Sequence, residues 1–186
     1  MRNILMTLAA ASLVVPSAAA LADPEVAPDI EAVAATATTT VSLTSGDSNW
    51  TTTLVGTTPS WTEVRSREVT SGRFLDPDDI ETAAAVVVLG PDTAAELLTG
   101  NPVGQHVSYE GSSLEVIGVL EELSSSDDAT NNDLAIVAST TYAQRLIGGP
   151  DRNSVSSIYV KATSEATLSA AYQEADATLT LSLIHI

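Results

Sequence analysis

The chain has 186 residues, a formal net charge of −17 at pH 7 and no cysteine. The negative charge argues against nucleic acid as a partner, because affinity for nucleic acid comes largely from Lys and Arg contacts to phosphate; it also argues against a simple electrostatic hold on an anionic membrane. The absence of cysteine excludes disulfides, thiolate metal sites and a cysteine nucleophile. The length allows one domain or two small subdomains. Since 44% of the residues are hydrophobic but only 4% are aromatic, the core is expected to be aliphatic.

The first 22 residues have the features of a secretory signal peptide. Arg2 supplies a positive charge, residues 4–15 form an apolar run too short to span a bilayer comfortably, and residues 18–22 contain two overlapping A-x-A cleavage patterns. The alternative is an Ala-rich lead-in to the folded domain, with a helix at residues 17–22. Pro24 would limit such a helix, because the residue before a proline is disfavoured in the helical region.

The next part of the chain is predicted to be rich in strands. Residues 29–37 carry apolar side chains at helical spacing, so either a short helix or the start of a strand fits them. Residues 45–49 are turn formers and predict a hairpin between the strands on either side. The runs that we interpret as strands are 38–43, 50–57 and 61–70.

The stretch from Gly72 to Leu120 changes its pattern from strand to helix to hairpin. An unbroken apolar run closed by Gly-Pro predicts a buried strand at 85–89. A short helix is predicted at 93–99, followed by a turn at 101–104. The two strands of the predicted hairpin are 105–109 and 114–120.

The sharply acidic stretch Asp76–Glu81 has two interpretations. Hard cations prefer several carboxylate oxygens, so a divalent-metal site is one of them. We favour the other, a short helix that begins at Pro77 with Asp76 as its N-cap and with acids in its first turn. A second oxygen-rich segment, at 127–133, lacks the central Gly and the terminal Glu of an EF-hand loop. Neither segment is predicted to bind metal.

The C-terminal part predicts a strand, a helix, a second strand and a last helix. Their ranges are 134–138, 139–147, 155–162 and from Ser164 onward. The last helix carries an apolar stripe typical of core packing, formed by Leu168, Ala171, Tyr172, Ala175 and Leu179. Residues 181–186 end abruptly without a polar tail, and we interpret them as a non-native or truncated tail. The alternative is an ordinary final strand.

No catalytic, cofactor-binding or metal-ligating residue is predicted. The two histidines, His106 and His185, lie in no HExxH or other paired metal spacing, and His106 is expected to be a half-exposed strand residue. The sequence contains neither a G-x-S-x-G nucleophile elbow nor a G-x-x-x-x-G-K-[ST] phosphate loop. We therefore expect a protein that is not an enzyme and uses no cofactor. The rival is a hydrolase that uses the acidic segments, and it predicts tight divalent-cation binding.

An ordered set of short motifs carries a family resemblance. The motifs are EVTSGRFLDPDDI around 69–74, Val86–Gly90, Asn101–Gln105, Glu115–Leu120 and Ser139–Gly148, with Asn49–Thr51, Val55–Thr58 and Ala20–Pro24 upstream. In this order they resemble the MacB-like periplasmic core domain of ABC transporter permeases, in the FtsX-type permease superfamily. The resemblance runs from about Ala18 to about Thr180.

The resemblance implies an α+β fold with mixed sheets and short helices in two small subdomains, one inserted in the other. It implies a place outside the cytoplasmic membrane, between the first and second of four transmembrane helices. The implied partners are those permease helices, a separate ATPase subunit and a periplasmic partner protein. The implied role is to couple membrane-helix motion to substrate or partner engagement in export. We expect the core domain at 23–180, between the segments 1–22 and 181–186.

One feature departs from the family pattern: no run of about 18 or more apolar residues occurs. Either a truncated piece of a permease or a stand-alone exported binding module without transport activity fits this departure. Within the family frame, Gly90 is expected to allow a strand-to-helix turn, and Gly104 to adopt a left-handed conformation before the hairpin.

Overall fold

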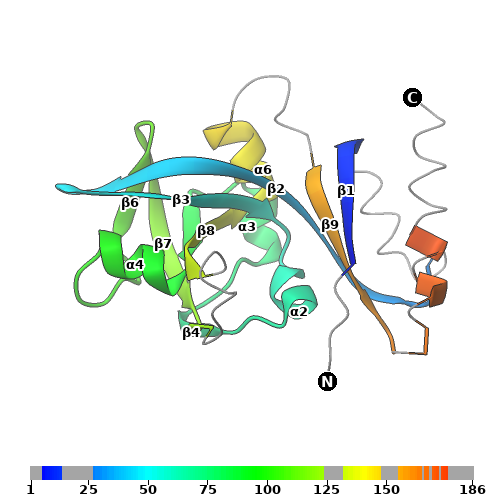
Figure 1. The fold of residues 1–186 in the computed structure, drawn as a ribbon. Coiled ribbons are helices and arrows are strands. Elements are labelled where there is room, and N and C mark those ends of the chain that lie inside the picture. The colour runs from blue at the N-terminus through cyan, green and yellow to red at the C-terminus, as the bar shows by residue number, and fades with distance from the viewer. Residues whose placement is uncertain are drawn as a thin grey trace. The chain divides into compact units, whose positions relative to one another are not determined.

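The chain folds into two compact units (Figure 1). The computed structural model describes residues 6–13, 27–123, 132–147, 155–164, 166–167, 169–171 and 173–175. Unit 1 comprises Met1–Ala37, Ser60–Ser66 and Asn153–Ile186, and unit 2 comprises Thr38–Pro59 and Arg67–Arg152. The chain therefore leaves unit 1 twice to build unit 2 and returns each time. The predicted α+β fold with one subdomain inserted in the other is confirmed.

Unit 1 is built on an antiparallel sheet with β9 (Val155–Ala162) as its middle strand. β9 pairs with β1 (Met6–Leu13) on one side and with the first half of β2 (Ile30–Ser45) on the other. The strand predicted at 155–162 is confirmed, and the ambiguous residues 29–37 lie mainly in a strand. Part of the apolar N-terminal run thus forms a strand, while the signal peptide or lead-in at 1–22 stays a prediction.

The core of unit 1 forms between this sheet and the helical residues near the C-terminus. Ile158 and Val160, which share one face of β9, are both buried. The cluster around them consists of Ala27, Ile30, Val33, Val155, Ala171 and Ala175. The predicted apolar stripe is thus confirmed at Ala171 and Ala175, whereas its other members and the tail at 181–186 lie outside the described residues.

The strand predicted at 61–70 is wrong for its first half. Residues Trp61–Arg65 form helix α2, and only Val69–Gly72 form a strand, β4. Trp61 and Val64 are the buried residues of α2. They lie three residues apart, which places them on one face of a helix and on opposite faces of a strand.

The strands of unit 2 close into a ring of hydrogen-bonded neighbours. In order, the ring contains the second half of β2, β3 (Ser48–Thr57), β8 (Leu134–Ala138), β5 (Val86–Leu89), β7 (Ser112–Leu120) and β6 (His106–Tyr109). The pair Thr44↔Ser108 joins β6 back to β2 and closes the ring. β4 pairs with the C-terminal part of β7, beyond β6. The sheet is mixed: β3 is parallel to β8 and β5 to β7, whereas β5 and β8 are antiparallel.

The core of unit 2 is aliphatic, as the composition predicts. Its largest fully buried side chains are Leu43, Leu54, Val87, Val88, Leu89, Val107, Leu114, Leu120 and Ile136. All five residues of β8 are buried, as expected for a strand that is covered on both faces. The strand predicted at 134–138 is confirmed, and the one predicted at 85–89 begins one residue later.

Glycines in unit 2 occupy positions that require positive φ values or close backbone approach. Glu110 and Gly111 connect β6 to β7 with φ values of 47° and 84°, the positive values that a two-residue hairpin of type I′ requires. Gly104 has a φ of 87°, which confirms its left-handed conformation. Gly90 has an ordinary φ of −68°, but a Cβ atom there would lie 2.1 Å from the carbonyl oxygen of Asn132. Gly90 is thus needed for close backbone approach.

The helices that the structure describes in unit 2 are short. They are α3 (Pro77–Glu81), α4 (Pro91–Leu97), α6 (Ser139–Thr141) and η1 (Tyr142–Leu146). The helix predicted at 139–147 is therefore α-helical only at its start, and η1 is a π-helix that ends with a bond of 2.9 Å from the Ile147 N–H to the Tyr142 carbonyl. Within the described part of the chain, no helix has both the length and the apolar character needed to cross a membrane.

Candidate functional site

The acidic stretch Asp76–Glu81 starts a helix, as we favoured. The Asp76 carboxylate accepts a hydrogen bond of 3.0 Å from the Asp79 backbone N–H, and the Asp79 carboxylate accepts one of 3.0 Å from the Asp76 N–H. Pro77 occupies the first turn. Arg73 binds both acids, with its Nη1 atom 2.6 Å from Asp79 Oδ2 and 3.1 Å from Asp76 Oδ2. These carboxylates are therefore engaged in capping and ion pairing.

The ion pair changes the protonation behaviour of both partners. The hydrogen bond from Arg73 lowers the pKa of Asp79, and the same bond raises the pKa of Arg73. The Asp79 side chain is 7% exposed and that of Arg73 is 48% exposed, so one partner is buried and the other reaches solvent. The pair stabilises the link between β4 and α3.

The second oxygen-rich segment also has structural roles where it is described. The Asn132 side chain donates a hydrogen bond to the Leu123 carbonyl and accepts one from the Leu123 N–H, each at 3.0 Å. Asp133 Oδ1 accepts hydrogen bonds from Trp50 Nε1 at 2.9 Å and from Thr93 Oγ1 at 2.8 Å. These bonds join the residues before β8 to β3 and α4.

The remaining metal-ligand candidates lie largely outside the described residues. Residues 127, 128 and 131 lie outside the described part of the chain, as does His185. Among the residues that are described, no three His, Cys, Asp or Glu side chains gather in a group that could hold a metal ion. His106 lies on β6, a strand as predicted, and its side chain is exposed.

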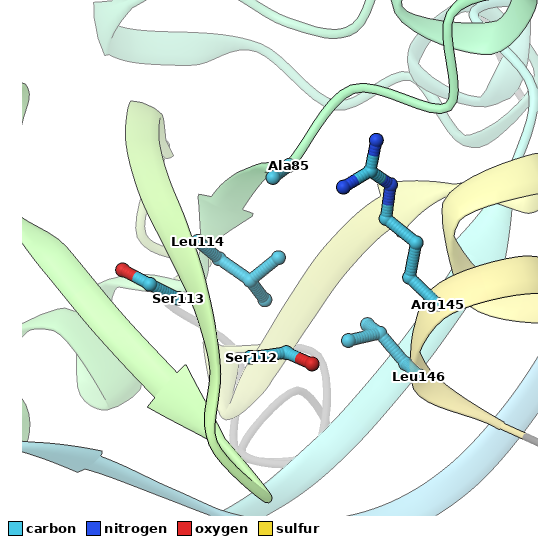
Figure 2. Close-up of a pocket in the computed structure, with 6 residues that line it drawn as sticks. All are labelled: Ala85, Ser112, Ser113, Leu114, Arg145 and Leu146. Atoms are coloured by element: carbon cyan, nitrogen blue, oxygen red, sulfur yellow. The ribbon is translucent and has the colours of Figure 1, made fainter.

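A pocket of about 270 Å³ lies in unit 2, where the start of β7 faces the end of η1 (Figure 2). Its described lining residues are Ala85, Ser112, Ser113, Leu114, Arg145 and Leu146. Figure 2 shows Leu114 and Leu146 facing one another, with the guanidinium group of Arg145 extending towards Ala85. Both leucines are buried and Arg145 is exposed. The pocket therefore combines apolar walls with one cation.

Sequence reasoning singled out none of the pocket residues as a site. The segments that line the pocket are far apart in the chain, and the pairing of β5 with β7 and the hydrogen bond from Thr141 to Ala84 bring them together. The one signal in the sequence is Arg145, a basic residue in a chain with only seven Lys and Arg against 24 Asp and Glu. Its position within the helix predicted at 139–147 gave no spacing that indicates chemistry.

A family model for the MacB-like periplasmic core domain matches residues 4–178. The chain belongs to this family. The matched range includes nearly the whole chain and begins before the start at Ala18 that the sequence motifs indicated. The MacB-like periplasmic core domain therefore includes β1 and both units described above.

Relatives with the same domain are export proteins by name. The chain is 32% identical over 143 residues to the macrolide export ATP-binding/permease protein MacB of Hyphomonas neptunium, which covers 75% of this chain and 22% of that protein. It is 32% identical over 96 residues to the pyoverdine export ATP-binding/permease protein PvdT of Pseudomonas fluorescens, which covers 50% of this chain and 15% of that protein. The chain thus spans about a fifth of the length of these relatives.

Two solved structures of domains from transporters have the same fold. The periplasmic region of MacB from Actinobacillus actinomycetemcomitans matches with a TM-score of 0.77 at 22% identity, over 92% of this chain and 75% of that chain. The extracellular domain of the transporter YknZ from Gram-positive bacteria matches with a TM-score of 0.76 at 19% identity, over 95% and 91%. At these identities the likeness concerns the fold alone.

Proposed function

We propose that this MacB-like core domain lies on the extracytoplasmic face of the cell membrane and couples motion of permease helices to substrate or partner engagement in export. The family match and the names of the relatives support the transporter context. Fold alone does not determine function. The division of the chain between the two units supports the mechanical role.

The observation that carries the proposal is the path of the chain. The first and the last described segments, β1 and residues 173–175, belong to unit 1, whereas unit 2 consists of segments between them. In a permease with membrane helices before and after this domain, unit 1 would receive their motion at two points. Unit 2 would then be the part available to a substrate or to a periplasmic partner protein.

Unit 2 has features of a body that moves without deforming. Its strands close into a ring, and its core is fully buried aliphatic side chains. Packed interiors of this kind have low compressibility and transmit displacement. Domain motions in proteins commonly consist of such bodies moving on a few connecting residues.

The energy for this motion would come from an ATPase. The relatives are named ATP-binding/permease proteins, so in them the two activities belong to one protein. For this chain, we propose the same two parts as partners: permease transmembrane helices and an ATPase that drives them. The domain itself would carry no catalytic residue.

A domain exchange tests the proposal. In the Hyphomonas relative, the whole segment that corresponds to residues 4–178 of this chain is replaced by those residues. Macrolide resistance is then measured in cells that lack their own exporter. We expect the chimera to retain resistance well above that of cells without an exporter. The relative with its own domain is the positive control.

A second chimera separates folding from function. It carries the same exchange with Thr38–Pro59 and Arg67–Arg152 each replaced by a short Gly-Ser linker, which removes unit 2. We expect it to reach the membrane at a normal level and to confer no resistance. Normal membrane insertion of the first chimera with no resistance would contradict the proposal and would favour a stand-alone exported binding module.

A further inference from the structure

Cations are scarce in this chain, and the described ones are nearly all engaged. All Lys and Arg side chains except those of Arg2 and Arg152 are described. Arg73 binds Asp76 and Asp79, Lys161 binds Glu31 and Glu63, Arg67 donates to the Glu121 carbonyl, and Arg65 lies over the ring of Tyr159. Arg145 differs from these. Among the described residues, none brings a carboxylate or carbonyl oxygen within hydrogen-bonding distance of its guanidinium group.

Hydrogen bonds hold together the segments that line the pocket beside Arg145. Thr141 Oγ1, just before η1, donates to the Ala84 carbonyl at 2.8 Å. The Glu115 N–H on β7 donates to the carbonyl of Ala85 at 2.9 Å. The residues before β5 are thus tied to β7 and to α6, the helix that leads directly into η1. A pocket with walls fixed in this way loses little conformational entropy when it is filled.

The π-helix η1 is anchored on its other side by Tyr142. This ring is buried against Gly56 of β3, where a Cβ atom would lie 2.5 Å from Tyr142. The wide turn of η1 then presents Arg145 and Leu146 to the same pocket. Single π-helical turns are rare and are frequent at functional sites.

We propose that this pocket binds a small carboxylate that carries an apolar group next to the charge. The planar guanidinium of Arg145 can donate two parallel hydrogen bonds to a carboxylate. Leu114 and Leu146 form the apolar wall that would receive the hydrocarbon part (Figure 2). Ser112 shares a strand face with Leu114, because side chains alternate along a strand, and offers a hydroxyl group. The proposal does not depend on the transport role.

Two sources could supply this chemistry: a free organic acid, or the C-terminal carboxylate of a polypeptide that ends in an apolar residue. The first probe is hexanoate, titrated into the ¹⁵N-labelled 186-residue chain and followed by ¹H–¹⁵N NMR spectra. We expect saturable shifts at residues 85, 112–114 and 145–146, with a dissociation constant in the millimolar range expected for so small a ligand. Hexanamide, the neutral isostere, should bind at least tenfold more weakly.

A pair of variants tests the role of the cation. Arg145→Gln should weaken hexanoate binding at least tenfold, whereas Arg65→Gln, which removes the same charge in unit 1, should change it less than twofold. Both variants should keep the amide spectrum of the wild-type chain away from the substituted residue. Equal hexanoate affinity in Arg145→Gln and the wild-type chain, or shifts that fall outside the pocket, would overturn the proposal.

A peptide arm distinguishes the two sources. A pentapeptide that ends in Leu is titrated with its carboxylate free and, separately, amidated. Tighter binding of the free-acid peptide than of hexanoate, at the same residues and lost on amidation, supports the polypeptide source. Binding of hexanoate with no gain from the peptide supports the small organic acid. Binding of the amidated peptide as tight as that of the free acid would contradict a carboxylate site.

Discussion

Asp79 combines two interactions that are usually provided by different residues. It accepts the hydrogen bond of a helix cap from the Asp76 N–H and forms the buried half of an ion pair with Arg73. From the sequence alone, the stretch Asp76–Glu81 is compatible with a cation site as well as with a helix start, since capping and metal binding both favour clustered carboxylates. Arg73, six residues before Asp79, provides a positive charge for these carboxylates from within the chain.

The first prediction concerns the substitution Asp79→Asn. The substitution weakens the hydrogen bond to Arg73 and removes the negative charge that faces the guanidinium group. We therefore expect the substitution to lower the free energy of unfolding at pH 7 by about 1–3 kcal/mol. Asp78→Asn is the matched control, because Asp78 is exposed in the same turn, and it should change stability by less than about 0.5 kcal/mol. Urea unfolding followed by circular dichroism measures both. Equal stability of the two variants would contradict the assignment.

The pH dependence of this difference has a defined sign. Because the pKa of Asp79 is lowered in the folded state, the unfolded state takes up the proton first as the pH falls. The contribution of Asp79 is therefore complete above the unfolded value of about 3.9 and is lost as the pH falls through the lower folded-state pKa. The gap in unfolding free energy between the wild-type chain and Asp79→Asn should narrow from pH 7 to pH 3. A gap that stays constant would show that the carboxylate charge contributes nothing.

At the scale of elements, the β6–β7 hairpin places a residue where its backbone is strained. Glu110 has a φ of 47°, in the left-handed region that residues other than Gly, Asn and Asp rarely adopt. Gly111 follows with a φ of 84° and tolerates it without cost. Asn-Gly is the preferred pair for a two-residue turn of this kind.

The second prediction is that Glu110→Asn stabilises the chain. Asn adopts the left-handed conformation more readily than Glu, so we expect a gain of about 0.5–1 kcal/mol in the free energy of unfolding. Glu110→Gln is the control, because it removes the same charge without the conformational preference. If Gln gives the same gain as Asn, the effect is electrostatic and the turn geometry does not cause it.

The elements differ in how far the sequence predicts them. The β6–β7 hairpin, β8 and β9 follow from local apolar patterns and turn residues, and their predicted and observed bounds agree within one or two residues. The helix α2 was missed because its five residues are too few to establish a period, although Trp61 and Val64 have helical spacing. The π-helical form of η1 was also missed, since an i→i+5 bond leaves no distinct pattern in five residues.

The pocket could not be predicted for a different physical reason. Its walls come from residues near 85, 113 and 145, and they meet because β5, β7 and η1 are joined by pairings between distant parts of the chain. The closing pair of the ring, Thr44↔Ser108, is likewise a contact between residues far apart in sequence. Such long-range pairings depend on the whole fold, so a local sequence pattern does not predict them.

At the scale of the whole unit, the ring closure can be tested with a disulfide. Cα atoms of opposed residues in an antiparallel pair lie about 4.5–5.5 Å apart, which suits a disulfide. The third prediction is that Thr44→Cys combined with Ser108→Cys forms one, and that oxidation raises stability by about 2–4 kcal/mol because the cross-link closes a long loop. The chain has no other cysteine, so the product is unambiguous.

Mass spectrometry and urea unfolding of the oxidised and reduced double variant measure this outcome. Each single cysteine variant is the control for loss of the native side chain. Failure of the pair to cross-link under mild oxidation would contradict the pairing of β2 with β6. Cross-linking with no gain in stability would mean that the closure strains the ring.

At the scale of the whole molecule, the division of the chain into two units bears on the proposed coupling role. Two chain segments build unit 2, while the first and the last described segments belong to unit 1. If the domain couples helix motion to export, removal of unit 2 should cause a specific defect: ATP hydrolysis continues, but it no longer drives export. A passive binding module would not produce this separation of the two activities.

The most direct measurement is the ratio of macrolide exported to ATP hydrolysed, in proteoliposomes that contain the Hyphomonas chimera with residues 4–178 of this chain. We compare it with the chimera in which Thr38–Pro59 and Arg67–Arg152 are replaced by linkers. The account predicts that ATP hydrolysis stays within about threefold while export per ATP falls at least tenfold. An unchanged ratio in the chimera without unit 2 would contradict the coupling role.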